Sequence, residues 1–226
     1  MRASDTAYTA LRDDILHWVS PPGTVFAEVE QAQRLSISRT PVREAFARLA
    51  ADGLLVALPG RGLVVSDLSR DTIVELFELR IVLESEAARL VARRRDAQIF
   101  LELLEDFRLA PALLERDDNR NEYYALVARL DAAIDKAVGS QFMVSAIRQL
   151  RPHLVRARRL ARGDSERLLA AAAEHLTIVE AIVDGDAQLA ADATAVHLRK
   201  SLKNILESVD HSAIAASNSA AAMNHS

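Results

Sequence analysis

Two arginines and a threonine mark the start of one amphipathic segment. Arg39, Thr40 and Arg43 lie off an apolar stripe that repeats with the period of an α-helix. The stripe consists of Val42, Ala45, Phe46 and Leu49. Such a helix packs on one side and presents guanidinium groups near its N-terminus, where arginine can bond bidentately to guanine and free N–H groups suit phosphate. The spacing indicates a helix that enters the major groove of DNA, although periodicity alone leaves open a surface helix with solvated arginines.

The flanking sequence contains the elements that would position this helix. Ser38 or Thr40 is expected to cap it, with Pro41 in the first turn, where a missing N–H costs nothing. Apolar spacing predicts one earlier helix from about residue 6 to before the Ser/Pro/Gly run at 20–23, and a second over 28–35. Two β-rich runs, 54–58 and 63–66, surround a Pro/Gly turn and predict a hairpin with Arg61 at its tip. Residues 1–68 are therefore predicted to form a winged helix-turn-helix of three helices plus a β-hairpin wing.

This region resembles the winged helix-turn-helix of GntR-family transcription factors, FadR subfamily. The resemblance is carried by Ser38-Arg39-Thr40-Pro41-Val42-Arg43-Glu44-Ala45, by Pro22-Gly23 and Glu28 before it, and by Asp52-Gly53-Leu54 and Pro59-Gly60-Arg61-Gly62 after it. It implies a DNA-binding surface made of Ser38, Arg39, Thr40, Arg43, Arg61 and Gly62. One departure is Gln31, where relatives usually have a core leucine, and we expect it to loosen the second helix.

Composition limits the class of protein. The 226 residues, 50% of them hydrophobic, are enough for one large or two small domains, and we expect two. The absence of cysteine excludes disulfides, thiolate zinc sites and cysteine nucleophiles. No signal segment or membrane-spanning run is present, so we expect a soluble cytoplasmic protein without a membrane partner.

Charge indicates how DNA would be bound. The formal net charge is -4, and residues 1–66 carry seven arginines and no lysine against seven Asp plus Glu. The basic footprint is therefore local and consists of Arg39, Arg43, Arg48 and Arg61. Because phosphate contacts dominate DNA affinity, we expect specific binding to need a homodimer on a palindromic operator.

From residue 69 the pattern is wholly helical. We predict an all-α six-helix bundle over 69–210, with segments at about 69–95, 96–117, 119–138, 141–162, 165–184 and 186–209. Pro111 and Pro152 lie inside two of these segments and should kink or split them. The residues from 211 to 226 are small and polar without apolar periodicity, so we expect a disordered tail. The fold class is mainly α.

Ionisable residues stand on the inward stripes of four of these segments. Arg80 and Glu84 share a stripe with Ile73, Phe77, Ala87 and Val91. Asp131 shares one with Tyr124, Val127, Ile134 and Val138, His175 with Leu168, Ala172, Val179 and Ile182, and His197 with Ala190, Ala193 and Ser201. Each has an ordinary interpretation, as an internal ion pair or a hydrogen-bonded core histidine. Because burying charge is costly without a partner, convergence of all of them favours a small-molecule site.

Residues 70–210 resemble the FCD effector-binding domain of FadR-subfamily regulators in its shorter, VanR-like form. The resemblance is carried by Leu79-Arg80, Leu83-Glu84, Glu174-His175, Ala181-Ile182 through Gly185-Asp186, and His197. It implies a dimerising bundle with a divalent metal held by an aspartate and three histidines. His175 and His197 match two of these ligands, but Val127 stands at the aspartate position and Asp131 at the first histidine position. Two alternatives stay open: a zinc, nickel or manganese site of Asp131, His175 and His197, or a metal-free site.

The sequence thus predicts a ligand-responsive transcriptional regulator, expected to be a repressor, with operator DNA and a small carboxylate as partners. The resemblance places Arg80 against the effector, where a planar guanidinium suits a carboxylate; Glu84, Asp131, His175 and His197 complete the expected effector site. A metal-dependent all-α enzyme is one alternative, but no general base, nucleophile or H-E-x-x-H motif is identifiable. A ligand-binding module that has lost DNA binding is the other, and the intact Arg39, Arg43 and Arg61 argue against it.

Overall fold

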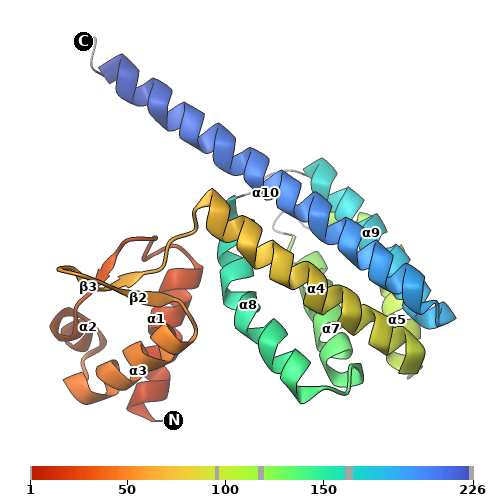
Figure 1. The fold of residues 1–226 in the computed structure, drawn as a ribbon, viewed down its shortest axis with the longest axis horizontal. Helices are drawn as coiled ribbons and strands as arrows, with labels where there is room; N and C mark the ends of the chain where they lie inside the picture. Colours follow the sequence, from red (N-terminus) through yellow and green to blue (C-terminus); the bar gives the residue numbers. More distant parts are fainter. Residues whose placement is uncertain (1, 95–96, 117–119, 161–164, 224–226) are drawn as a thin grey trace. The chain divides into compact units, whose positions relative to one another are not determined.

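The structure, a computed structural model, describes residues 2–94, 97–116, 120–160 and 165–223 (Figure 1). The chain divides into two compact units. The first contains residues 1–73 and 149–160, and the second contains residues 74–148 and 161–226. Each unit is described by itself below.

The first unit contains three helices and a small antiparallel sheet. The helices are α1 (Ala3–Leu16), α2 (Glu28–Leu35) and α3 (Arg39–Ala51), and the strands are β1 (Val25–Phe26), β2 (Leu55–Leu58) and β3 (Gly62–Val65). The strand order is β1-β3-β2, with Val25 opposite Val64 and Leu55 opposite Val65. The predicted winged helix-turn-helix is confirmed. The sequence did not predict β1, because two residues are too short to show the alternation that identifies a strand.

Backbone conformation sets the turns between these elements. Ser36 ends α2 in the left-handed region with φ 54°, which separates it from α3. In the hairpin turn, Gly60 and Gly62 have φ of 73° and 78°, a conformation that residues with a Cβ rarely adopt. Ser38 is the N-cap of α3 but makes no side-chain capping hydrogen bond, so the predicted cap is wrong at this position. The first N–H groups of α3 therefore have no side-chain acceptor from their own N-cap.

The apolar stripe of α3 is buried as predicted. Its four members are all at most 2% exposed, and Phe46 packs against Phe26 of β1 with ring centroids 5.7 Å apart. Leu11 and Ile15 of α1 complete this core. The stripe thus fixes which side of α3 faces solvent.

Part of a later helix also belongs to the first unit. Helix α8 (Gln141–Leu160) contributes residues 149–160, so this unit extends beyond the predicted range of 1–68. The His153 Nε2 atom lies 3.0 Å from the carbonyl oxygen of Asp52. Arg156, which is fully buried, donates from Nη1 to Ser66 Oγ at 2.8 Å and from Nη2 to the Ser66 carbonyl oxygen. Burial lowers the pKa of Arg156 to about 10.

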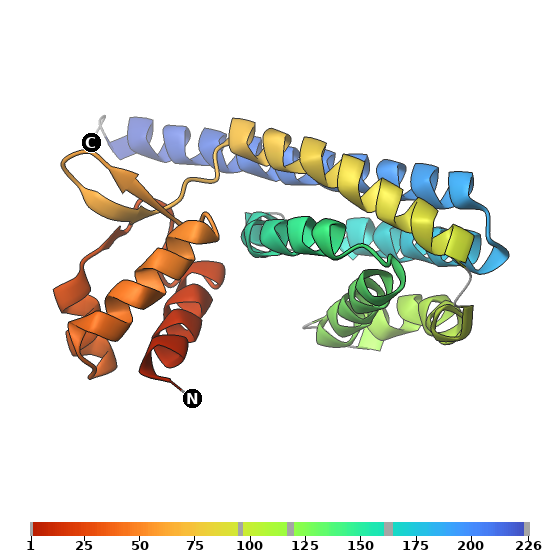
Figure 2. The same ribbon diagram turned by 60° about the horizontal axis from the view of Figure 1, so that its bottom comes forward.

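The second unit is helical throughout its described residues. It contains α4 (Arg70–Arg94) from Val74 onward, α5 (Ala97–Arg108), α6 (Ala110–Arg116), α7 (Asn121–Ala137), the first turns of α8, α9 (Ser165–Asp184) and α10 (Ala187–Met223). Helix α9 packs against α10 and α5, and α4 and α10 lie side by side in both views (Figure 2). The core of this unit includes Phe100, Leu103, Phe107, Leu126, Leu130, Ile178 and Val179.

The helix bounds of this half differ from the predicted segments at two places. The second predicted segment is split into α5 and α6 at Leu109, as expected from Pro111, which is tolerated only in the first turn of a new helix, so the described residues contain one helix more than the six predicted segments. Pro152, in contrast, lies inside α8, which continues past it. Helix α10 extends to Met223, into the range for which the sequence predicts a disordered tail. Its alanine-rich sequence has high helix propensity even without an apolar stripe.

The described helices include none with enough length and apolar content to cross a membrane.

Candidate functional site

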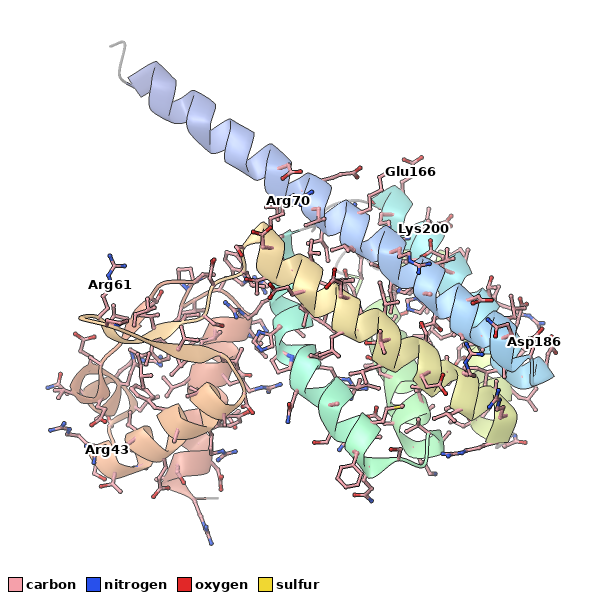
Figure 3. All side chains as sticks on the ribbon, viewed as in Figure 1. Arg43, Arg61, Arg70, Glu166, Asp186 and Lys200 are labelled. Carbon is pink, nitrogen blue, oxygen red and sulfur yellow. The ribbon has the colours of Figure 1, made fainter. Side chains whose placement is uncertain are left out.

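The six residues predicted to contact DNA are all exposed. Ser38, Arg39, Thr40 and Arg43 surround the start of α3, and Arg61 and Gly62 lie at the hairpin. Figure 3 shows Arg43 projecting outward from α3 and Arg61 projecting from the tip of the hairpin. The structure thus presents a helix N-terminus and a wing tip, each with an arginine, to solvent.

Glu28 pairs with both arginines of α3. Its carboxylate accepts hydrogen bonds from Arg43 Nε and Nη2, both at 2.9 Å, and from Arg39 Nη2 at 3.2 Å. The hydrogen bond from Arg43, with a smaller contribution from Arg39, lowers the pKa of Glu28 to about 2. The side chains of Arg39 and Arg43 remain 60% and 66% exposed.

Arg48, a third basic residue of α3, contacts α1. Arg48 forms an ion pair with Asp5 at 2.8 Å and lies 3.9 Å from the centroid of the Tyr8 ring. Tyr8 in turn donates to Asp52 Oδ2 at 2.6 Å. These contacts fasten α1 to α3, so Arg48 is not comparable with Arg39 or Arg43 as a DNA-facing group.

Gln31 has a polar partner on its own helix. It is half-buried, and its Oε1 accepts a hydrogen bond from Arg34 Nε at 2.8 Å. Arg34 is also paired with Asp14 of α1 at 2.6 Å. Gln31 is thus linked to α1 through Arg34, and the loosening of α2 stays a prediction.

In the second unit, Arg80 is buried beside Glu84. Arg80 is 5% exposed and donates from Nε to Glu84 Oε1 at 2.7 Å. Its guanidinium lies 5.2 Å from the centroid of the Phe77 ring. Among the described residues, no acceptor contacts its Nη1 or Nη2 groups, so these N–H donors remain available to water or to a ligand.

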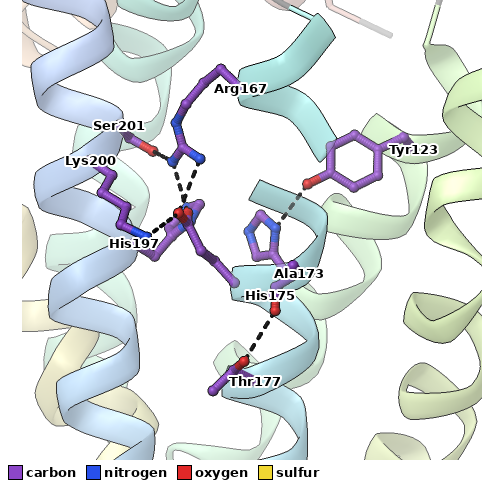
Figure 4. Close-up of polar contacts among 9 residues, drawn as sticks. Tyr123, Arg167, Ala173, His175, Thr177, His197, Lys200 and Ser201 are labelled. Atoms are coloured by element: carbon purple, nitrogen blue, oxygen red, sulfur yellow. Dashed lines mark hydrogen bonds and ion pairs between the residues drawn. The ribbon is translucent and has the colours of Figure 1, made fainter. Parts of the chain in front are cut away.

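Glu174 accepts hydrogen bonds from three side chains of α9 and α10, namely Arg167, His197 and Lys200, which are labelled in Figure 4. Its Oε2 lies 2.8 Å from Arg167 Nη2 and 2.7 Å from His197 Nδ1, and its Oε1 lies 3.1 Å from Lys200 Nζ. Burial opposes ionisation of Glu174, but hydrogen bonds from His197, Arg167 and Lys200 outweigh it and lower the pKa to about 2. The side chain of Glu174 is 10% exposed. It is therefore a buried anion with three donors.

Glu174 fixes the protonation pattern of His197. Burial lowers the pKa of His197, and the nearby charges of Arg80 and Arg167 act in the same direction against the hydrogen bond with Glu174. A carboxylate only accepts hydrogen bonds, so His197 carries its proton on Nδ1 and presents Nε2 as an acceptor.

His175 lies beside His197, with ring centroids 4.3 Å apart. Its Nδ1 atom is 3.0 Å from the hydroxyl of Tyr123, and its ring stacks on Phe107 at 5.5 Å. The structure thus brings His175 and His197 together, and Arg80 is near enough for its charge to lower the pKa of His197. We name the set Arg80, Glu84, Tyr123, Glu174, His175 and His197 the bundle cluster.

Asp131 lies half-buried on α7. The buried residues of α7 are Tyr123, Leu126, Val127, Leu130 and Ala133, whereas Tyr124 is 39% exposed. The inward stripe predicted from Tyr124 was therefore set one position off, and Asp131 lies half-buried at its flank. Among the described residues, no group of three or more His, Asp or Glu side chains is placed to hold a metal ion. Metal binding by Asp131, His175 and His197 stays a prediction of the sequence.

Comparison with known proteins identifies both units. Residues 3–65 match the family described as bacterial regulatory proteins, gntR family, and residues 75–200, more than half of the chain, match the FCD domain. The chain belongs to the GntR family. A similar relative is the Nta operon transcriptional regulator of Aminobacter aminovorans, 31% identical over 82% of this chain and 86% of the relative. Another is the HTH-type transcriptional repressor RspR of Escherichia coli, 30% identical over 63% of this chain and 67% of the relative.

Solved structures of GntR regulators show the same fold. E. coli McbR/YncC superposes with a TM-score of 0.72 at 19% identity, covering 92% of this chain and 98% of that chain. A GntR transcriptional regulator from Rhodococcus sp. RHA1 gives a TM-score of 0.70 at 20% identity, covering 90% and 97%. The protein is a transcriptional regulator with a DNA-binding helix-turn-helix and an FCD effector-binding domain, and not an enzyme.

Four residues of these sites were not predicted: Glu28 and Glu174 as hubs of charge, Tyr123 as the partner of His175, and Arg167 as a donor to Glu174. A signal existed for Tyr123, because Tyr123, Leu126, Val127 and Leu130 are themselves spaced as a helical stripe. Glu28 and Glu174 gave none, since both partners of Glu28 and two of the three partners of Glu174 lie on another helix.

Proposed function

We propose that this GntR regulator is a homodimeric repressor of the FadR subfamily that binds a palindromic operator and responds to a small carboxylate. The observation that carries the carboxylate is Arg80, a buried guanidinium whose Nη groups have no acceptor among the described residues. A planar carboxylate offers two oxygens that match those donors, and the ion pair with Glu84 uses only the Nε–H of the guanidinium. Bound effector would complete the bundle cluster.

On the DNA side, Arg39 and Arg43 would read base edges and Arg61 would contact phosphate or a minor groove. Arg39→Ala and Arg43→Ala should each cost about 1–3 kcal/mol of operator binding and blur base preference. Arg61→Ala should weaken binding evenly across sequences. Fluorescence anisotropy with the operator selected from a random duplex pool measures both. Wild-type affinity in the Arg39→Ala, Arg43→Ala double variant would contradict the assignment.

On the effector side, binding should take up a proton. His197 presents Nε2 as an acceptor when neutral, so it can donate to a carboxylate only when it is protonated there. Effector affinity should therefore rise as pH falls through the histidine range. Calorimetric titration with a panel of small mono- and dicarboxylates at several pH values tests this, and pH-independent binding would contradict it.

Arg80→Ala should abolish the effector response while leaving operator affinity unchanged. A matched control is Arg93→Ala, which removes the same charge from an exposed position on the same helix. A full response in Arg80→Ala would contradict the carboxylate proposal and leave the DNA-binding assignment intact.

Homodimerisation is supported by apolar side chains exposed on the two helices that lie side by side. Leu79 and Val82 of α4 are 49% and 67% exposed, and Leu189 and Val196 of α10 are 46% and 45% exposed. Exposed apolar surface of this kind marks interfaces. Val82→Asp should shift the sedimentation of the protein to a monomer, whereas Phe142→Asp on α8 should not.

Metal binding by Asp131, His175 and His197 remains the second form of the effector site. His197 donates its Nδ1–H to Glu174, which leaves the unprotonated Nε2 atom available to a metal ion. His175 and His197 alone are too few ligands for a metal site, so this form also needs Asp131. A chelator that lowers the melting temperature, with restoration by zinc, nickel or manganese, would support the metal form. An unchanged melting temperature with chelator and with each ion would leave the metal-free form.

A further inference from the structure

One carboxylate lies against both arginines at the start of α3. Arg39 and Arg43 stand one helical turn apart, and Glu28 reaches them from the first turn of α2. We propose that Glu28 determines specificity as a positioning residue, by holding Arg43 so that its second donor edge faces a base. The inference rests on the proposed base contacts of Arg39 and Arg43.

The atoms of the contact decide which edge of Arg43 is used. A guanidinium presents two pairs of parallel N–H donors: Nε with Nη2, and Nη1 with Nη2. Glu28 accepts from Nε at 2.9 Å and from Nη2 at 2.9 Å, which is the first pair. No acceptor among the described residues contacts Arg43 Nη1. The pair left available is the one that can donate together to O6 and N7 of a guanine.

Charge gives Glu28 a second effect. Arg39 and Arg43 are like charges at i, i+4, which repel each other on an isolated helix. Glu28 Oε2 accepts from the Nη2 atoms of both, and α3 has no acidic residue in its own first turn. The carboxylate therefore holds two guanidiniums close together and still leaves one net positive charge for phosphate. With its pKa at about 2, it stays ionised at neutral pH.

A simpler role would be that of a counter-ion that weakens all DNA binding. The two roles predict opposite results when the charge is removed. A counter-ion slows or weakens binding to any duplex, so its removal strengthens operator and non-operator binding alike. A positioning residue orders an exposed side chain, so its removal weakens the operator while non-operator binding holds or rises.

The test compares Glu28→Gln with Glu30→Gln in the full-length protein. Glu30 lies in the same first turn, is exposed and makes no ion pair or hydrogen bond through its side chain among the described residues, so both variants lose one charge. Binding is measured on the selected operator and on a scrambled duplex. We expect Glu28→Gln to lower the operator-to-scrambled affinity ratio about tenfold and Glu30→Gln to leave it unchanged.

A base analogue reads the contact directly. Each operator guanine is replaced in turn by 7-deazaguanine, which lacks the N7 acceptor. In the wild type, one replacement per half-site should weaken binding, and in Glu28→Gln the same replacement should cost little. The effect of Glu28→Gln on the affinity ratio should also largely disappear in an Arg43→Ala background.

The outcomes separate the two proposals. If no guanine is sensitive in the wild type and Arg43→Ala binds normally, the base contacts themselves are wrong. A different result would contradict only the positioning role of Glu28. In that case Arg43→Ala loses operator affinity, but Glu28→Gln has the same operator-to-scrambled affinity ratio as Glu30→Gln, or binds both duplexes more tightly to the same extent.

Discussion

Glu28 in the winged helix and Glu174 in the bundle are two carboxylates with the same low pKa and different surroundings. Each accepts hydrogen bonds from cationic side chains, which lower its pKa to about 2. The partners of Glu28 have side chains 60% and 66% exposed, whereas His197 and Arg167 beside Glu174 are 8% and 15% exposed. Exposed ion pairs contribute little to stability, whereas buried ones are costly to break. The two carboxylates therefore have similar pKa values but are expected to contribute differently to the free energy of unfolding.

The difference fits what each region has to do. A surface that meets a polyanion needs cations that water and phosphate can reach, and Arg39 and Arg43 keep most of their side chains in solvent. A site inside a helical bundle needs its charges compensated before any ligand arrives. Glu174 compensates the charge of Arg167 and accepts from neutral His197, while Arg80 pairs with Glu84. The comparison therefore predicts that the two carboxylates respond differently to the same substitution.

The largest effect should follow removal of the buried carboxylate. Glu174→Ala removes the carboxylate that pairs with Arg167 and accepts from His197, and we expect the free energy of unfolding of the bundle to fall by about 2 kcal/mol. Urea denaturation followed by circular dichroism measures it. Glu166→Ala is the control, because Glu166 is exposed on the same helix and makes no ion pair or hydrogen bond through its side chain among the described residues. Equal midpoints for the two variants would show that Glu174 is no more important than a surface charge.

Acid should have an intermediate effect through His197. Its pKa is lowered from 6.5 in the folded state, chiefly by burial, so the folded state binds fewer protons than the unfolded state in this range. The stability from keeping it neutral is present above pH 6.5 and is lost as pH falls through the folded pKa. His153 has the same sign, since burial lowers its pKa as well.

Substitution separates the histidines. Going from about pH 7.5 to about pH 5.5, the urea midpoint of the wild type should fall, and His197→Gln should show a smaller fall. His17→Gln, on an exposed histidine, should behave as the wild type. A fall of the same size in His197→Gln would exclude His197 as the titrating group.

The same contrast explains what the sequence could and could not predict. The winged helix was read from local patterns, because the stripe of α3 and the Pro/Gly turn fix which residues face outward. All six predicted DNA-facing residues are exposed. In the bundle, Arg80, His175 and His197 were placed correctly on buried faces, but the stripe of α7 was set from Tyr124 instead of Tyr123. Two apolar or aromatic neighbours at a helix start make both registers possible, and only packing against α5 and α6 selects one.

Contacts between segments far apart in the sequence could not be predicted. Within the first unit, His153 and Arg156 of α8 contact residues about a hundred positions earlier in the chain, and no periodicity indicates these contacts. The sequence also does not predict that Glu28 and Glu174 each accept from several side chains, because most of those partners lie on another helix. From the sequence alone, an acidic residue in a first helical turn or on the side of a helix is expected to be solvated, because the partners on the facing helix are not known.

The smallest effect, on stability, should follow removal of the exposed carboxylate. Glu28→Gln breaks ion pairs with Arg39 and Arg43, but all three groups reach water, which replaces the lost hydrogen bonds. We therefore expect its urea midpoint to equal that of Glu30→Gln within error, at low and at high salt. A loss of stability as large as that of Glu174→Ala would mean that Glu28 holds α2 to α3, and that a change in DNA specificity in this variant reflects a displaced helix. An unchanged midpoint combined with a reduced affinity ratio would assign the effect of Glu28 to the orientation of Arg43, because the fold of the winged helix would then be intact.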